Sequence, residues 1–291
     1  MMMRYDTMVL ENELEEARKM IITENDFSEN LKEIIDEKNF HITELLERLN
    51  EAIKKLDEYE KVTALLEEIK EQEKELFGHL VSVSILAQQI GIWAKWEDYE
   101  LEYAALGGML HDIGLFQTIE KKKKKIPFKD ELQGHGYEKH VTEGTHLLKT
   151  LRIDQEVIKA VLGHHERIDG NGFPMRLSGA MVNKIARALA VADTYDVYTM
   201  KQKGEYGWPL LIALQRMEDE GSRKLDSGLV QVFIEHIVEK AVGKTAVLSD
   251  GSTGKIVMIN KYDLLYPIVD CRGRSMDLSM MKRVCVEDIV M

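Results

Sequence analysis

The chain has 291 residues, of which 44% are hydrophobic and 31% charged, so it can bury a full core and is not typical of a disordered protein. Its formal net charge of -12 argues against general binding to DNA or RNA, because proteins that bind the phosphate backbone normally present a basic surface. No leader-like segment and no run of about 18 apolar residues occurs, and the two cysteines match no metal-binding spacing. We therefore predict a cytoplasmic protein without a membrane partner.

The first part of the chain, residues 1–73, contains neither Pro nor Gly and is rich in Glu, Lys and Leu. Its apolar residues recur in alternating steps of four and three, as in the seam of a coiled coil: Ile42, Leu46, Leu49, Ile53 and Leu56. One interpretation is a single long helix that packs on its own domain. We favour a long coiled-coil helix that forms a parallel homodimer, because so long a helix cannot bury its apolar stripe alone.

Residues 74–242 keep the helical periodicity in shorter pieces, and we expect an all-helical bundle there. The turn sequence Asp169-Gly170-Asn171-Gly172-Phe173-Pro174 interrupts the helices. The expected helices cover residues 76–90, 99–111, 137–151, 155–165, 180–200, 210–217 and 229–242.

Residues 243–291 change to short runs that favour β-strands, such as Val247 and Ile256-Val257. Asp250-Gly251 and Gly254 are expected in hairpin turns. The sequence therefore predicts a mainly α protein in three parts, with a small antiparallel β domain at its C-terminal end.

Histidines and aspartates with metal-binding chemistry are spread over four of the expected helices: His111-Asp112, His140, His164-His165 and Asp193. Side chains that point inward from different helices of a bundle can share one or more ions. Mixed nitrogen and oxygen ligands suit iron, manganese or zinc better than calcium or magnesium. The pattern indicates a metal-dependent hydrolase.

Each of these residues also has a structural interpretation. His164-His165 can end a helix, where positive charge offsets the helix dipole. Asp193 directly follows the apolar stretch 188–192, where an unpaired carboxylate would be costly to bury. His79 lies among apolar residues, and Glu75 lies four residues before it on the same helical face, although Glu75 can equally belong to a solvated stalk.

Taken in order, the motifs resemble those of the HD-GYP family, the bacterial HD-superfamily phosphodiesterases that degrade cyclic di-GMP. The resemblance covers residues 75–240. It is carried by Leu110-His111-Asp112-Ile113-Gly114, His140-x-x-x-Gly144, His164-His165-Glu166-x-x-Asp169-Gly170-x-Gly172-Phe173-Pro174 and Ala192-Asp193-x-x-Asp196.

The resemblance implies an all-helical fold with a centre of two or three divalent metal ions, commonly iron or manganese. It implies that His111 and Asp112 are central to catalysis and that Asp112 bridges two ions. The ligands that it implies are Glu75, His79, His111, Asp112, His140, His164, His165 and Asp193.

The residues that the resemblance places at the substrate depart from the family pattern in part. Phe173 replaces the tyrosine of the Gly-Tyr-Pro element, which here reads Gly172-Phe173-Pro174, and Asp196 matches an aspartate at the substrate. Leu115 stands where the family usually has a phosphate-binding lysine, and Gln202 where it often has an arginine. Lys201, Lys203 or the run 121–125 could replace these charges, although the run can also be a solvated loop.

These departures leave three interpretations of function. The first is a phosphodiesterase that opens cyclic di-GMP to pGpG or GMP. The second is a receptor that binds a cyclic dinucleotide with little turnover, and the third is a phosphodiesterase for another cyclic dinucleotide such as cyclic GMP-AMP. A purely structural coiled-coil protein would explain none of the histidines.

Overall fold

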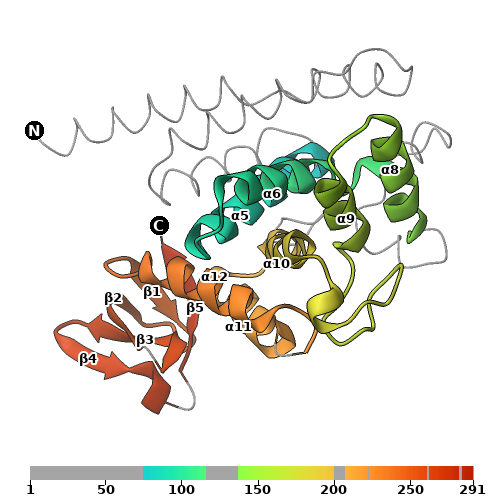
Figure 1. Ribbon diagram of the computed structural model, residues 1–291. Coiled ribbons are helices and arrows are strands. Elements are labelled where there is room, and N and C mark those ends of the chain that lie inside the picture. Colours follow the sequence, from blue (N-terminus) through green and yellow to red (C-terminus); the bar gives the residue numbers. More distant parts are fainter. Residues whose placement is uncertain are drawn as a thin grey trace, which may run out of the picture. The chain divides into compact units, whose positions relative to one another are not determined.

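The computed structural model describes residues 75–115, 137–199, 207–221, 223–260, 262–281 and 284–290. Within these ranges the chain forms seven α-helices followed by a five-stranded antiparallel sheet, which confirms the predicted helical class with a small C-terminal sheet (Figure 1). The predicted coiled coil, Lys201, Gln202, Lys203 and the lysine run 121–125 lie outside the described residues. The predicted division at residues 73 and 242 stays a prediction.

The described residues belong to two compact units, which divide between Ala192 and Asp193. In the first unit α5 packs against α6, α6 against α9, and α9 against α8 (Figure 1). Its elements are α5 (Glu75–Trp93), α6 (Asp98–Leu110), α8 (Lys139–Thr150), α9 (Gln155–Gly163), the 3-10 turn η1 (Gly179–Met181) and the first part of α10 (Lys184–Thr199).

Close backbone contact brings α5 and α6 together. A Cβ atom added to Gly108 would lie 2.4 Å from the Cα atom of Ser84, so only glycine allows this approach. The Ser84 hydroxyl donates to the Ala105 carbonyl at 2.6 Å. On α5 the side chains of Leu80 and Ile85 are fully buried.

Local polar residues set the helix starts. The Asp154 carboxylate accepts the backbone N–H of Glu156 at 2.8 Å and caps α9. Helix α10 begins at Lys184 rather than at the predicted residue 180, because the Asn183 side chain caps the N–H groups of Ile185 and Ala186.

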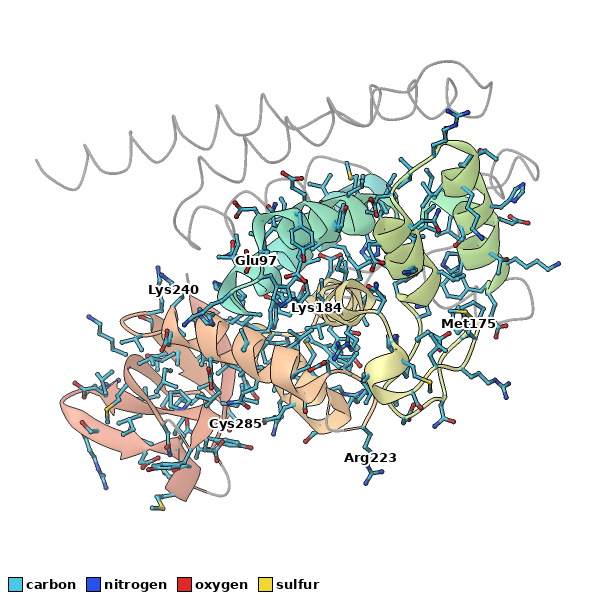
Figure 2. All side chains as sticks on the ribbon, in the orientation of Figure 1. Glu97, Met175, Lys184, Arg223, Lys240 and Cys285 are labelled. Atoms are coloured by element: carbon cyan, nitrogen blue, oxygen red, sulfur yellow. The ribbon has the colours of Figure 1, made fainter. Side chains whose placement is uncertain are left out.

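Contacts on the surface of the first unit also join distant segments. Lys184 forms an ion pair with Glu100 at 2.7 Å and lies 4.5 Å from the centre of the Trp96 ring (Figure 2). This pair ties the start of α10 to the first turn of α6.

The second unit contains the rest of α10, two further helices and the sheet. Its strands are ordered β4-β3-β2-β1-β5, and all neighbours are antiparallel. The elements are α11 (Leu210–Gly221), α12 (Ser227–Glu239), β1 (Thr245–Leu248), β2 (Thr253–Asn260), β3 (Asp263–Cys271), β4 (Arg274–Asp277), the 3-10 turn η2 (Leu278–Met280) and β5 (Val286–Val290).

One of the two predicted hairpin turns is confirmed and the other is wrong. Asp250-Gly251 joins β1 to β2, and Gly251 has a φ of 80°, which favours glycine. Gly254 lies inside β2 opposite Ala246. A Cβ atom there would lie 2.5 Å from Cγ1 of Val269, so tight packing and not a turn explains this glycine.

A search of the described helices for a membrane-crossing segment finds none with sufficient length and apolar character.

Candidate metal centre

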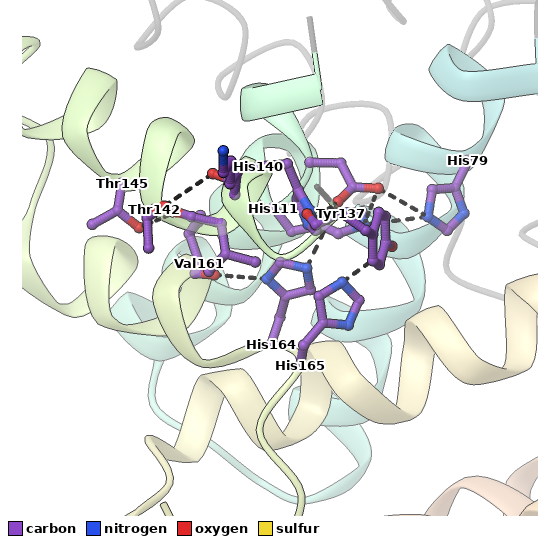
Figure 3. Close-up of polar contacts among 12 residues, drawn as sticks. His79, His111, Tyr137, His140, Thr142, Thr145, Val161, His164 and His165 are labelled. Atoms are coloured by element: carbon purple, nitrogen blue, oxygen red, sulfur yellow. Dashed lines mark hydrogen bonds and ion pairs between the residues drawn. The ribbon is translucent and has the colours of Figure 1, made fainter. Parts of the chain in front are cut away.

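Asp112 lies among buried histidines, which are labelled in Figure 3, and each of its two oxygens faces a different pair. Oδ1 lies 3.0 Å from Nε2 of His140 and 3.7 Å from Nε2 of His164. Oδ2 lies 3.5 Å from Nε2 of His111 and 4.0 Å from Nε2 of His79. The two nitrogens of this second pair are themselves only 3.2 Å apart. One carboxylate therefore lies between two pairs of histidines. The first pair comes from α8 and the end of α9, and the second from α5 and the end of α6.

Three of these histidines are oriented in the same way by the main chain. In each, Nδ1 contacts the backbone carbonyl three residues earlier: His111 that of Gly108 at 2.7 Å, His164 that of Val161 at 2.6 Å, and His140 that of Tyr137. His111 and His164 directly follow the last residues of α6 and α9, where carbonyls lack a partner within the helix. The contact fixes Nδ1 as the donor and leaves the lone pair of Nε2 toward Asp112.

His165 joins the group through different contacts. Its ring centre lies 3.9 Å from that of His164 and 4.6 Å from that of Phe173. Its Nε2 makes a hydrogen bond of 3.2 Å with the hydroxyl of Tyr137. The aromatic neighbours therefore hold this ring at the edge of the buried group.

The electrostatics follow from burial and from the crowding of these groups. Burial alone would raise the pKa of the Asp112 carboxyl, but the electrostatic interaction with His111 and the polar contacts with His140 and His164 outweigh it and hold this pKa well below its usual range. Burial lowers the pKa of His165, and the neighbouring His164 and His140 lower it further. An ionised carboxylate therefore stands beside a neutral imidazole.

Two glycines bring α8 close to Asp112. A Cβ atom on Gly114 would lie 1.9 Å from the carbonyl oxygen of His140, and one on Gly144 would lie 3.0 Å from the Gly114 nitrogen. The backbones can cross at this distance only without side chains. Gly114 and Gly144 therefore allow a close backbone approach, which places His140 against Asp112.

A buried carboxylate holds the turn that follows the paired histidines. Glu166 accepts the backbone N–H of Met175 at 2.6 Å and that of Leu177 at 2.9 Å. Gly172 packs so closely that a Cβ atom would lie 2.4 Å from the Cα atom of Glu166. The turn is thereby fixed with Phe173 against His165.

The donors present fit divalent metal ions. One ligand atom from each of Asp112, His140, His164 and His165 lies within 4.8 Å of the others, and all four residues are buried. Oδ1 of Asp112 and Nε2 of His164 are buried and make no hydrogen bond with any residue in the described ranges. Imidazole nitrogens directed at an ionised carboxylate form a set of lone pairs, which a cation stabilises.

The other predicted site residues are placed as follows. Asp193 is half-buried and Asp196 fully buried on α10, in the part of the helix that belongs to the second unit. Leu115 is buried. Glu75 is the first residue of α5, but its side chain lies outside the described structure, as do Lys201 and Lys203.

Two residues of the site have roles that the sequence analysis missed. Tyr137 was expected only as the start of a helix, and Glu166 only as part of a motif. The acid of Glu166 directly after two histidines and before a Gly-rich turn is a usable signal, because such a turn leaves backbone N–H groups without partners. No local pattern marks Tyr137, whose hydroxyl contacts His165, 28 residues away in sequence.

Comparison with known proteins gives matches over most of the chain. Residues 29–229 match the family described as HD domain. A cyclic di-GMP phosphodiesterase of Pseudomonas aeruginosa is 28% identical over 209 residues, which cover 71% of this chain and 50% of that protein. A 3'3'-cGAMP-specific phosphodiesterase of Vibrio cholerae is 28% identical over 153 residues, which cover 52% of this chain and 34% of that protein. The chain thus spans half or less of the length of these two relatives.

A solved structure supports the fold. The HDG"Y"P protein of Bdellovibrio bacteriovorus superposes with a TM-score of 0.56 at 18% sequence identity. The superposition covers 72% of this chain and 68% of that one.

Proposed function

This chain belongs to the HD domain family, and from that premise we propose that it is a metal-dependent phosphodiesterase that hydrolyses cyclic di-GMP to pGpG or GMP. The observation that carries the proposal is the position of Asp112, whose two oxygens face two separate histidine pairs. A carboxylate placed in this way suits a site for two neighbouring ions. The names of the relatives from Pseudomonas aeruginosa and Vibrio cholerae support a cyclic dinucleotide as the substrate.

The proposed cofactor is two or three divalent ions, with iron or manganese favoured by the mixture of imidazole and carboxylate ligands. When bound, such ions neutralise phosphate oxygens and generate a nucleophile from water at neutral pH. The residues proposed to hold them are Glu75, His79, His111, Asp112, His140, His164, His165 and Asp193.

The residues of the chain prepare the site for this chemistry. The main-chain carbonyls before His111, His140 and His164 fix which nitrogen of each ring faces the centre. Burial of Asp112 excludes water and strengthens its interactions with charged groups. The low pKa of this carboxyl keeps it ionised at neutral pH, so no proton competes for its oxygens.

The substrate contacts are proposed from the resemblance and from the fixed turn. Gly172, Phe173 and Pro174 lie in the turn that Glu166 holds beside His165. Asp196 is proposed as a further contact. Lys201 and Lys203 are proposed to supply positive charge that Leu115 does not provide.

We further propose a homodimer through residues 1–73, which is supported by the heptad pattern of that segment. A cytoplasmic location is supported by the two cysteines, Cys271 and Cys285, which are both free thiols.

The first test is anaerobic turnover of cyclic di-GMP by the full chain loaded with Fe(II) or Mn(II). We expect pGpG or GMP to appear, and we expect Asp112→Ala to lose both the product and the bound metal. Asp98→Ala, which removes an exposed carboxylate, serves as the control and should keep both.

The same assay separates the proposal from the other interpretations. Tight binding of cyclic di-GMP by fully metal-loaded protein without turnover would contradict the enzyme and favour a receptor. Turnover of cyclic GMP-AMP in preference to cyclic di-GMP would contradict the proposed substrate, but it would agree with the proposed phosphodiesterase reaction.

A further inference from the structure

Tyr137, which stands two residues before α8, lies against three rings of the site (Figure 3). Its ring centre is 4.5 Å from that of His140, 5.4 Å from that of His165 and 6.3 Å from that of Phe173. The side chain is half-buried. Tyr137 is therefore held in place but keeps part of its surface accessible.

Tyr137 contacts the histidine group at both ends. Its carbonyl accepts a hydrogen bond from Nδ1 of His140, and its hydroxyl makes a hydrogen bond of 3.2 Å with Nε2 of His165. The first contact fixes the backbone of Tyr137 beside the metal centre. The second shows that the phenol oxygen reaches the ligand atoms themselves.

The nitrogen that Tyr137 contacts belongs to one of the histidines grouped around Asp112. His140 and His165 belong to one group of potential ligands within 4.8 Å. A nitrogen whose lone pair binds an ion can neither accept nor donate a hydrogen bond. If an ion binds Nε2 of His165, the phenol hydroxyl can donate to a ligand at the same place.

Two of the residues expected at the substrate that the structure describes offer no hydroxyl or ammonium there. Phe173 lies against His165 without a polar atom on its ring, and Leu115 is buried and apolar. A phosphate oxygen is a strong acceptor and prefers a donor that is already held in position.

We propose that Tyr137 is a substrate-binding residue whose hydroxyl donates a hydrogen bond to a phosphate oxygen of the cyclic dinucleotide. The inference rests on the proposed function. It deepens that function by naming a contact for the phosphodiester within the first compact unit. Loss of one hydrogen bond to a charged acceptor weakens binding by roughly 10- to 100-fold.

The test compares Tyr137→Phe with Tyr103→Phe in the full chain loaded with Mn(II). Tyr103 on α6 is a matched control. Its hydroxyl donates to Asp154 at 3.0 Å, and Tyr103→Phe likewise removes one phenol oxygen. The probe is a non-hydrolysable phosphorothioate analogue of cyclic di-GMP, and its Kd is measured by calorimetry. Bound metal is counted in the same samples, and KM and kcat are measured with cyclic di-GMP.

We expect Tyr137→Phe to bind the analogue roughly 10- to 100-fold more weakly and to raise KM, with metal content equal to that of the unmodified protein. Tyr103→Phe should change none of these quantities. An unchanged Kd in Tyr137→Phe would overturn the inference, and so would a loss of metal large enough to explain the weaker binding. If the unmodified, metal-loaded protein neither binds nor hydrolyses any cyclic dinucleotide, the proposed function itself fails.

Discussion

The interior of the helical unit and the interior of the C-terminal sheet are stabilised differently. The sheet buries apolar side chains such as Leu248, Ile256, Leu265 and Val269. The helical unit buries two carboxylates and five histidines among its apolar residues: His79, His111, Asp112, His140, His164, His165 and Glu166. Hydrophobic burial suffices to stabilise the interior of the sheet. In the helical unit, buried polar groups cost free energy, but they form a place that can bind ions.

The largest effect should come from removing the proposed metal ions from the histidine and aspartate group. Dialysis of the full chain against a chelator should abolish turnover. Because an ion at a hundredfold excess over its Kd stabilises the folded state by about 2.7 kcal/mol, amide hydrogen exchange should quicken by roughly 100-fold where the ion is held. Peptides from α6 and α9 should show the change and peptides from β2 and β3 should not. Equal increases in exchange rate in both sets of peptides would contradict the difference between the two interiors.

The next effect tests the apolar interior. Leu265→Ala in β3 should lower the free energy of unfolding by about 2–5 kcal/mol, because the lost side chain leaves a cavity. Metal content per chain should stay unchanged. Urea denaturation and metal analysis measure the two quantities, with the exposed Val257→Ala as the control. A loss of bound metal in Leu265→Ala would contradict the separation of the two interiors.

A smaller effect concerns pH in the metal-free protein. The folded pKa of His165 is lowered, so the unfolded chain binds more protons once the pH falls below about 6.5, and folding then becomes less favourable. Asp112 acts in the same direction, but only below about 3.9, because its folded pKa is also lowered. Stability should fall by at most about 1.4 kcal/mol per pH unit for one such group.

Thermal melting of chelator-treated protein between pH 7.5 and 5.5 measures this dependence. His165→Gln should flatten the curve relative to the unmodified protein. A melting temperature that rises on acidification would show that the sign is wrong.

The smallest effect is expected at the surface. Lys184→Ala removes an ion pair with Glu100 and the contact with Trp96, which are together worth at most about 1 kcal/mol because solvent screens the charges. Urea denaturation should detect little change, and metal content should be equal. Lys159→Ala, which breaks a more exposed pair with Glu156, provides the comparison. A loss of several kcal/mol at Lys184 would show that surface contacts, and not the interiors, dominate stability.

Most of the candidate metal centre could be predicted because its residues are chemically unusual where they stand. His111, Asp112, His140 and the pair at 164–165 interrupt apolar segments, so their burial followed from the pattern, and the structure brings them together.

Features that depend on distant contacts could not be predicted. Gly254 was mistaken for a turn residue, since nothing local reveals that Val269 and Cys271 crowd its position from the neighbouring strand. Tyr137 was missed for the same reason, because its partner His165 lies 28 residues away.

The carbonyl contacts of His111, His140 and His164 have a consequence for how this site evolves. Each ring takes its direction from a main-chain oxygen three residues earlier, and every amino acid supplies that oxygen. A mutation at Val161 changes the side chain but leaves the carbonyl that orients His164. The backbone therefore sets the directions of the imidazoles. The neighbouring side chains can change during evolution while the geometry of the histidines is kept.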